Sequence, residues 1–171
     1  MGGSQGTRSG GSSLDETVRF SARIREMVGA VERGDGAGVR ACFTEEGVYD
    51  DVFYGVFKGD GIISLINDYF WRDATDFMWD IHDPVAAGGI GYARYVFSYR
   101  PKLEGVGEGR AIFEGVAICR MRDGLIDEYR EVARESVALA AMDFAPERIA
   151  KYLSKQDREL RSRTEAARHL D

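Results

Sequence analysis

From about residue 75 onward, the apolar residues recur at the two-residue period of β-strands, whereas earlier residues follow helical spacing. Residues 90–100 and 110–122 predict two long strands, and an Asp123-Gly124 turn follows the second. The apolar face of the first strand is Ala93, Tyr95, Phe97 and Tyr99, and that of the second is Ala111, Phe113, Gly115, Ala117 and Cys119. Strands joined by short turns predict an antiparallel meander.

Helical patterns precede and follow this meander. Helices are expected at 14–34, 36–43, 60–71 and 145–168, further strands at 48–53, 76–83 and 125–134, and a turn from Pro84 to Gly89. Helices early and a meander late indicate an α+β fold. We expect a cone-shaped, curved antiparallel sheet wrapped on the N-terminal helices, plus a C-terminal helix.

The domain boundaries follow from composition. Residues 1–13 are rich in Gly and Ser and predict a disordered tail, and Ser13 with Glu16 forms a capping-box pattern at the first helix. Residues 14–142 are expected to form an α+β barrel domain, and residues 143–171 a C-terminal helical extension. The narrow apolar stripe of that extension fits a helix on the rim of the sheet, a lid or a partner-binding helix.

The overall composition is acidic. The net charge is −6, and the two cysteines, Cys42 and Cys119, lie among apolar neighbours without a CxxC motif. An acidic balance argues against nucleic acid or an anionic membrane as a partner, and no apolar leader or membrane-length apolar run is found. We expect a cytoplasmic protein with two buried free thiols, no nucleic-acid partner and no membrane contact.

The segment Val48-Tyr49-Asp50-Asp51-Val52 places two adjacent carboxylates inside an otherwise apolar strand. Charges are costly to bury, so these acids indicate either a pocket or a surface strand end. Because strand side chains alternate, only one of Asp50 and Asp51 faces the interior, and a bulge would reverse the choice. An acid in an apolar pocket has a raised pKa, which suits a general acid or base.

Two other polar residues are candidate catalytic groups. His82 lies between acidic residues that can hold it protonated, although a histidine before Pro84 is also typical of a loop. Glu131 shares a face with Tyr129 and either lines the pocket beside Asp50 or forms a surface salt bridge. No second His or Cys stands at ligand spacing, so we expect no metal site and no cofactor.

Aromatic side chains are the candidate substrate-binding residues. The wall of the pocket and its hydrogen-bonding groups are expected from Tyr49, Tyr54, Trp79, Tyr95, Phe97, Phe113 and Tyr129. Core packing alone would also explain such an aromatic stripe.

Four segments carry a family resemblance through their order and spacing. They are Val31-Glu32-Arg33-Gly34-Asp35, Val48-Tyr49-Asp50-Asp51-Val52 with Lys58-Gly59, Gly115-Val116-Ala117-Ile118-Cys119-Arg120-Met121-Arg122-Asp123-Gly124, and Ile126-Asp127-Glu128-Tyr129-Arg130-Glu131. Together they resemble the nuclear transport factor 2-like superfamily, which includes SnoaL-like, ketosteroid isomerase-like and limonene epoxide hydrolase-like proteins. The resemblance implies a conical pocket closed by helices, a small apolar ligand, and a homodimer formed through the sheet. It also implies proton-transfer chemistry without a metal.

Two families within the resemblance match single positions. In ketosteroid isomerases the general base is the Asp of a Val-Glu-Asp-Pro-Val run, which Asp50 matches, while Met27 and Ala117 replace the oxyanion-hole residues. Scytalone dehydratase uses two histidines; His82 matches the first position, and Ala93 replaces the second.

Limonene epoxide hydrolases match at more positions. Their attacking water is held by a Tyr-x-Asn on the first strand and an Asp on the last strand, which Tyr49, Asp51 and Glu131 resemble. The Arg and second Asp of that site are replaced by Tyr95 and Phe97. The hydrolase match favours Asp51 as the inward acid, whereas the isomerase match favours Asp50, which we prefer at this point.

The sequence therefore predicts a small-molecule-binding SnoaL-like protein. We expect a metal-free enzyme that transfers protons or activates water on an apolar substrate, as an epoxide hydrolase, isomerase or dehydratase. The alternative is a non-catalytic ligand-binding protein or a dimeric scaffold of the same fold.

Overall fold

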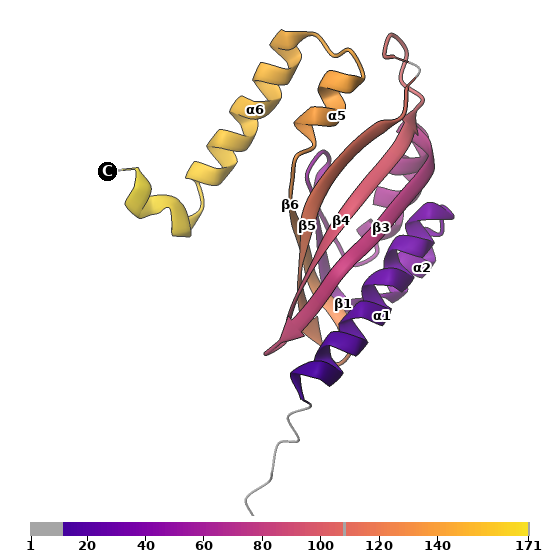
Figure 1. The fold of residues 1–171 in the computed structure, drawn as a ribbon, viewed down its shortest axis with the longest axis vertical. Coiled ribbons are helices and arrows are strands. Elements are labelled where there is room, and N and C mark those ends of the chain that lie inside the picture. Colours follow the sequence, from indigo (N-terminus) through magenta and orange to yellow (C-terminus); the bar gives the residue numbers. More distant parts are fainter. Residues whose placement is uncertain (1–11, 108, 171) are drawn as a thin grey trace, which may run out of the picture.

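A computed structural model of the chain describes residues 12–107 and 109–170. The helices are α1 (Ser13–Glu32), α2 (Gly36–Ala41), α3 (Gly61–Ser64), η1 (Leu65–Phe70), α4 (Trp71–Asp73), α5 (Ser136–Ala141), α6 (Pro146–Arg161) and η2 (Thr164–His169). The strands are β1 (Phe43–Asp51), β2 (Gly55–Lys58), β3 (Ala74–Ala87), β4 (Ile90–Pro101), β5 (Ala111–Arg122) and β6 (Leu125–Ala133). They form one curved sheet (Figure 1). The order of the strands in this sheet is β2-β1-β6-β5-β4-β3.

The α+β fold is confirmed, with one refinement of strand direction. The pairs β3–β4, β4–β5 and β5–β6 are antiparallel, as the predicted meander requires. Strand β1 pairs with β6 in parallel, so the sheet is mixed. This pairing joins the first strand to the last and sets the acids of β1 beside those of β6.

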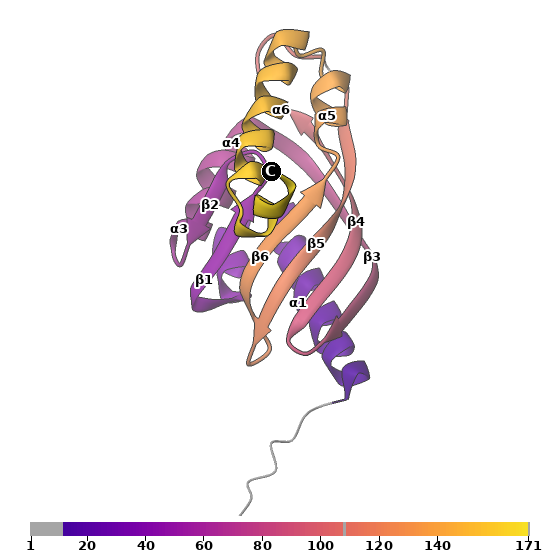
Figure 2. The same ribbon diagram turned by 90° about the vertical axis from the view of Figure 1, so that its left-hand side faces the viewer.

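Helix α1 packs on the inner face of the sheet through Phe20, Ile24 and Met27, which are buried. Its N-cap is Ser12, whose hydroxyl accepts the backbone N–H of Asp15 at 3.3 Å, rather than the predicted Ser13. The predicted tail at residues 1–13 lies, up to residue 11, outside the described residues. α1 and α6 lie on opposite sides of the sheet (Figures 1 and 2).

Three element predictions are wrong in extent. Strand β1 runs from Phe43 to Asp51 rather than over the predicted 48–53, and its pairing with β6 shifts register between Phe43 and Val48. The helix predicted at 60–71 contains a π-helical turn, η1, which changes the angular position of the residues that follow. β3 continues through Pro84 because this edge strand absorbs the proline at a bulge between His82 and Val85.

The C-terminal segment lies at one end of the sheet. Helix α5 follows β6 directly, and α6 then runs back past the outer side of the sheet (Figure 2). The hydroxyl oxygen of Tyr152 in α6 lies 3.0 Å from the carbonyl oxygen of Val52, and this hydrogen bond connects α6 to the turn after β1. Within the described residues, no helix has both the length and the apolarity that a membrane crossing requires.

Gly91 of β4 allows α1 to approach the sheet closely. A Cβ atom at this position would lie 2.6 Å from the Phe20 ring, which is itself buried. At Gly109, by contrast, a Cβ atom would meet nothing within 4 Å.

We expect Gly91→Ala to lower the free energy of unfolding by about 1–3 kcal/mol, because the added methyl overpacks the contact between α1 and β4. Urea unfolding followed by circular dichroism measures this change. The control Gly109→Ala should stay within about 0.5 kcal/mol of wild type. Equal stability of the two variants would contradict the close packing at Gly91.

Candidate active site

A cavity of about 240 Å³ opens between the inner face of the sheet and the C-terminal segment. Its walls are overwhelmingly apolar and aromatic. The lining residues are Asp51, Val52, Phe53, Tyr54, Phe70, Asp73, Ala74, Phe77, Trp79, Tyr95, Phe97, Tyr99, Leu103, Phe113, Glu131, Leu139, Met142, Phe144 and Arg148. Three carboxylates and Arg148 therefore face an otherwise mainly apolar cavity.

The pairing of β1 with β6 brings two of these acids together. Tyr49 pairs with Tyr129 across the two strands, and their rings lie 4.5 Å apart between centroids. Asp51 and Glu131 are each two residues further along parallel strands, so both point to the same inner face. Two carboxylates thus stand side by side in a site that water reaches poorly.

Asp51 is buried, with 5% of its surface exposed. Its Oδ1 accepts the backbone N–H groups of Phe53 and Tyr54, each at 2.9 Å, which shapes the turn after β1. Burial raises the pKa of Asp51 to about 6, although these two hydrogen bonds act in the opposite direction.

Glu131 is held by two tyrosines. The hydroxyls of Tyr95 and Tyr129 both donate to its Oε2, the second at 3.1 Å. Burial, followed by the charge of Asp51, raises the pKa of Glu131 to about 8. Gly115 lies opposite Tyr95 on β5, and a Cβ atom there would come within 2.5 Å of the Tyr95 hydroxyl, so the glycine makes room for this contact.

Of the four predicted catalytic residues, the structure brings together Asp51 and Glu131. Asp50 has the opposite orientation on β1 and is partly exposed, so the preference for Asp50 as the inward acid is wrong. The cause is register: Tyr49 and Asp51 share the buried face up to the last residue of the strand. His82 alternates with the inward-facing Trp79 and Ile81 and so lies on the outer face of β3.

The predicted substrate-binding residues divide into two groups. Tyr54, Trp79, Tyr95, Phe97 and Phe113 line the cavity. Tyr49 and Tyr129 are fully buried behind the two acids, where Tyr129 supports Glu131 by its hydrogen bond.

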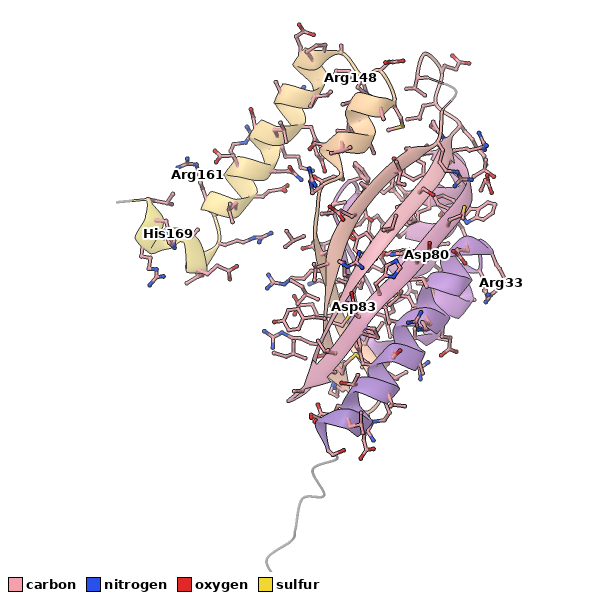
Figure 3. All side chains as sticks on the ribbon, in the orientation of Figure 1. Arg33, Asp80, Asp83, Arg148, Arg161 and His169 are labelled. Carbon is pink, nitrogen blue, oxygen red and sulfur yellow. The ribbon has the colours of Figure 1, made fainter. Side chains whose placement is uncertain are left out.

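Sequence reasoning missed two parts of the site. Asp73 lines the cavity at the end of α4, where the π-helical turn hides its orientation from a helical pattern. The C-terminal segment contributes Leu139, Met142 and Phe144, and Arg148 stands at the first turn of α6 (Figure 3). The short apolar run at 136–142 was the available signal for this closure.

Within residues 12–107 and 109–170, no three His, Cys, Asp or Glu side chains are grouped so as to hold a metal ion. The chemistry that the described side chains offer is that of acids and bases. Cys42 and Cys119 are free and buried.

Comparisons with known proteins agree with this architecture. The SnoaL-like domain model matches residues 24–129. No curated protein sequence matches the chain at a significant level. The match ends before α5 and α6, so the segment that completes the cavity lies outside it.

Several solved structures share the fold at low identity. TsrD from Streptomyces laurentii is 18% identical, with a TM-score of 0.62 over 74% of this chain and 96% of that one. An LEH-like epoxide hydrolase from M. tuberculosis is 17% identical, with a TM-score of 0.60 over 74% and 91%. A protein with a ketosteroid isomerase-like fold from Catenulispora acidiphila, in complex with trimethylamine, is 18% identical, with a TM-score of 0.64 over 72% and 97%.

The raised pKa of Glu131 makes a prediction about stability. Its ordinary value is 4.5, and folding moves it to about 8, so the folded protein binds the proton more tightly than the unfolded chain does. The stability that this proton contributes is complete below the ordinary pKa and is lost as the pH rises toward the folded value.

We expect Glu131→Gln to remove this loss, because an amide stays neutral at every pH. The variant should exceed wild type in unfolding free energy by about 1 kcal/mol or more near about pH 8.5, and the gap should close toward about pH 5. Urea unfolding at several pH values measures it. Glu114→Gln, at an exposed acid of β5, is the control and should show no such widening. A constant gap would contradict the buried, protonated state of Glu131.

Proposed function

The chain belongs to the SnoaL-like domain family, and from that premise we propose that it is an acid–base enzyme that opens an epoxide on an apolar, ring-containing substrate with water. The observation that carries this proposal is that two carboxylates, Asp51 and Glu131, line the same apolar cavity, where burial raises the pKa of both.

The two acids have different protonation states because their surroundings differ. Asp51 keeps two backbone hydrogen bonds, which favour its ionised form. Glu131 lies among tyrosines, where burial and the charge of Asp51 both raise its pKa, so it keeps the proton. Paired acids with pKa values pushed apart supply a base and an acid in one site.

The reaction then uses each group once. Asp51 takes a proton from a water molecule as the water oxygen attacks an epoxide carbon, and the C–O bond of the ring breaks. Glu131 gives its proton to the departing epoxide oxygen, so the product is a diol. A proton passing from Asp51 back to Glu131 restores the starting state, and the aromatic walls hold the substrate rings.

Sequence resemblance supports this reaction over isomerisation. Tyr49, Asp51 and Glu131 resemble in sequence the positions at which limonene epoxide hydrolases hold their water, and of these Asp51 and Glu131 line the cavity. One structural neighbour is an LEH-like epoxide hydrolase. The Arg and Asp that accompany this site in those enzymes are replaced by Tyr95 and Phe97. Tyr95 takes over the positioning of the acid through its hydrogen bond to Glu131.

A non-catalytic ligand-binding role is the second candidate. It is favoured by the structural use of both acids, since Asp51 shapes a turn and Glu131 anchors two tyrosines. In that case the cavity would bind an apolar molecule without converting it.

We also propose that the protein forms a homodimer through the outer face of the sheet. Apolar side chains are exposed there at Met78, Tyr92, Ile112, Val116 and Val132. Burying such a face against a second copy would remove apolar surface from water.

Substitution of either acid tests the catalytic proposal. With cyclic alkene epoxides such as 1-methylcyclohexene oxide, Asp51→Asn and Glu131→Gln should each lower diol formation by about 100-fold or more. Asn keeps the oxygen that accepts the two turn N–H groups, so the fold is preserved. Asp50→Asn, on the opposite face, should keep wild-type activity. Diol formation that survives both inward substitutions would rule out this mechanism.

The pH profile tests the shared proton independently. The active form has Asp51 ionised and Glu131 protonated, so kcat/KM should rise with pH through about 6 and fall through about 8. These limbs belong to the pair as a whole, since the two acids interact. A rate that rises steadily to about pH 9 would contradict the acid role of Glu131.

A further inference from the structure

The cavity has a second polar point away from the Asp51–Glu131 pair. Tyr54, in the turn between β1 and β2, donates its hydroxyl to Asp73 Oδ2 at 2.8 Å, and both residues line the cavity. Arg72 donates two hydrogen bonds to the same carboxylate, with Nε 2.6 Å from Oδ1 and Nη2 2.7 Å from Oδ2. The guanidinium also lies over the Tyr69 ring at 5.1 Å.

Hydrogen-bond accounting shows what this point offers to a ligand. Tyr54 has one hydroxyl hydrogen, and Asp73 already receives it, so the phenol oxygen can only accept a further hydrogen bond. An ionised carboxylate also only accepts, and contact with Arg72 is the main reason that the pKa of Asp73 is lowered. The Tyr54–Asp73 pair therefore presents acceptors and no donor to the cavity.

The charge at this point selects among possible donors. Arg72 makes two hydrogen bonds to the Asp73 carboxylate and balances its charge. Tyr54, Asp73 and Arg72 together therefore carry no net charge. A neutral acceptor site suits a hydroxyl group better than an ammonium ion, which would need an unpaired carboxylate in such apolar surroundings.

We propose that the Tyr54–Asp73 pair binds a hydroxyl group of a ring-containing substrate, while the reacting group lies at Asp51 and Glu131. The substrate class is thus a hydroxylated cyclic compound, an inference that rests on the proposed use of this cavity as the substrate site. Tyr54 and Asp73 are specificity-determining residues, and Arg72 positions Asp73.

The turn between the two polar points supports a common role. Asp51 holds the backbone of Phe53 and Tyr54, so the residue proposed as the base also orients the tyrosine of the second point. Aromatic rings surround Tyr54, with Tyr69 at 5.4 Å and Phe70 at 5.8 Å between centroids. A ring-shaped substrate can therefore lie against aromatic surface while its hydroxyl reaches the pair.

Equilibrium binding to the full chain tests the hydroxyl assignment without turnover. The probes are 2-naphthol, its methyl ether 2-methoxynaphthalene, and the cation of 2-naphthylmethylamine, titrated by ligand fluorescence near about pH 6.5. Wild type should bind 2-naphthol about tenfold more tightly than the methyl ether, because only the naphthol donates a hydrogen bond. A methyl ether that binds equally well, a cation that binds more tightly than the naphthol, or binding of none of the three overturns the proposal.

Variants separate ligand recognition from a merely structural tie. Asp73→Ala frees the Tyr54 hydroxyl hydrogen, so the preference for naphthol over its ether should disappear or reverse. Tyr54→Phe keeps the ring and should weaken naphthol by about threefold or more while leaving the ether unchanged. If these variants bind both ligands more weakly by the same factor, Tyr54 and Asp73 have a structural role only, and the proposal is overturned.

The matched control is Asp127→Ala. Asp127 also pairs with an arginine, Arg122, and accepts a hydroxyl hydrogen, from Thr44 at 2.8 Å, but it lies outside the cavity lining. The Asp127→Ala variant should prefer 2-naphthol over its methyl ether by the same factor as wild type. If diol formation is absent while the naphthol preference and its loss in Asp73→Ala are found, the proposed reaction fails and the hydroxyl site stands. If diol formation depends on Asp51 and Glu131 while the preference for naphthol over its ether is absent, the proposed hydroxyl site fails and the proposed reaction stands.

Discussion

The burial of two carboxylates on neighbouring strands is the constraint on which the rest of the site depends. Each ionised carboxylate loses hydration in the cavity, and two charges side by side also repel. Two backbone N–H groups offset the lost hydration of Asp51, and two tyrosine hydroxyls together with a retained proton offset that of Glu131. Other features follow from these needs, including Gly115, whose missing side chain lets the Tyr95 hydroxyl reach Glu131.

Closure of the cavity reinforces this constraint. Leu139, Met142 and Phe144 come from a segment beyond the residues that the SnoaL-like domain model matches, and they replace water along one wall. Desolvation is the largest cause of the raised pKa of both Asp51 and Glu131. The C-terminal segment thus contributes to the raised pKa values, since every apolar wall that excludes water favours the neutral forms of the acids.

Sequence periodicity predicted the architecture well because regular strands impose it. The alternation in β4 and β5 identified Tyr95, Phe97 and Phe113 as inward-facing. For Glu131 the last strand left two alternatives, the pocket and a surface salt bridge, and in the structure Glu131 lines the cavity. The choice between Asp50 and Asp51 could not be made in this way, since the valines at 48 and 52 flank both acids and give no clear alternation. Pairing with β6, which depends on contacts about 80 residues away in the chain, decides it.

Asp73 escaped prediction for a different physical reason. A helical pattern assumes a constant angle per residue, and the π-helical turn at Leu65–Phe70 breaks that assumption just before Asp73. Its role depends on Tyr54 and on Arg72, the first of which lies in a turn with no periodicity at all. The orientation of a polar group on irregular backbone is known only from the structure, whereas that of a group on a long strand can be predicted from the spacing of the sequence.

The turn from Val52 to Tyr54 connects these parts mechanically. Its N–H groups bind the Asp51 carboxylate, the Val52 carbonyl accepts from Tyr152 of α6, and Tyr54 reaches Asp73. The Tyr152 hydroxyl also lies 2.9 Å from Oε1 of Glu135, a buried acid at the start of α5, so the two acceptors share its single hydrogen and the C-terminal segment and the turn meet at one polar junction. A shift of α6 would therefore move the turn, and with it both the proposed base and the proposed hydroxyl site. Closure of the cavity, orientation of Asp51 and recognition at Tyr54 are consequently coupled through three consecutive residues.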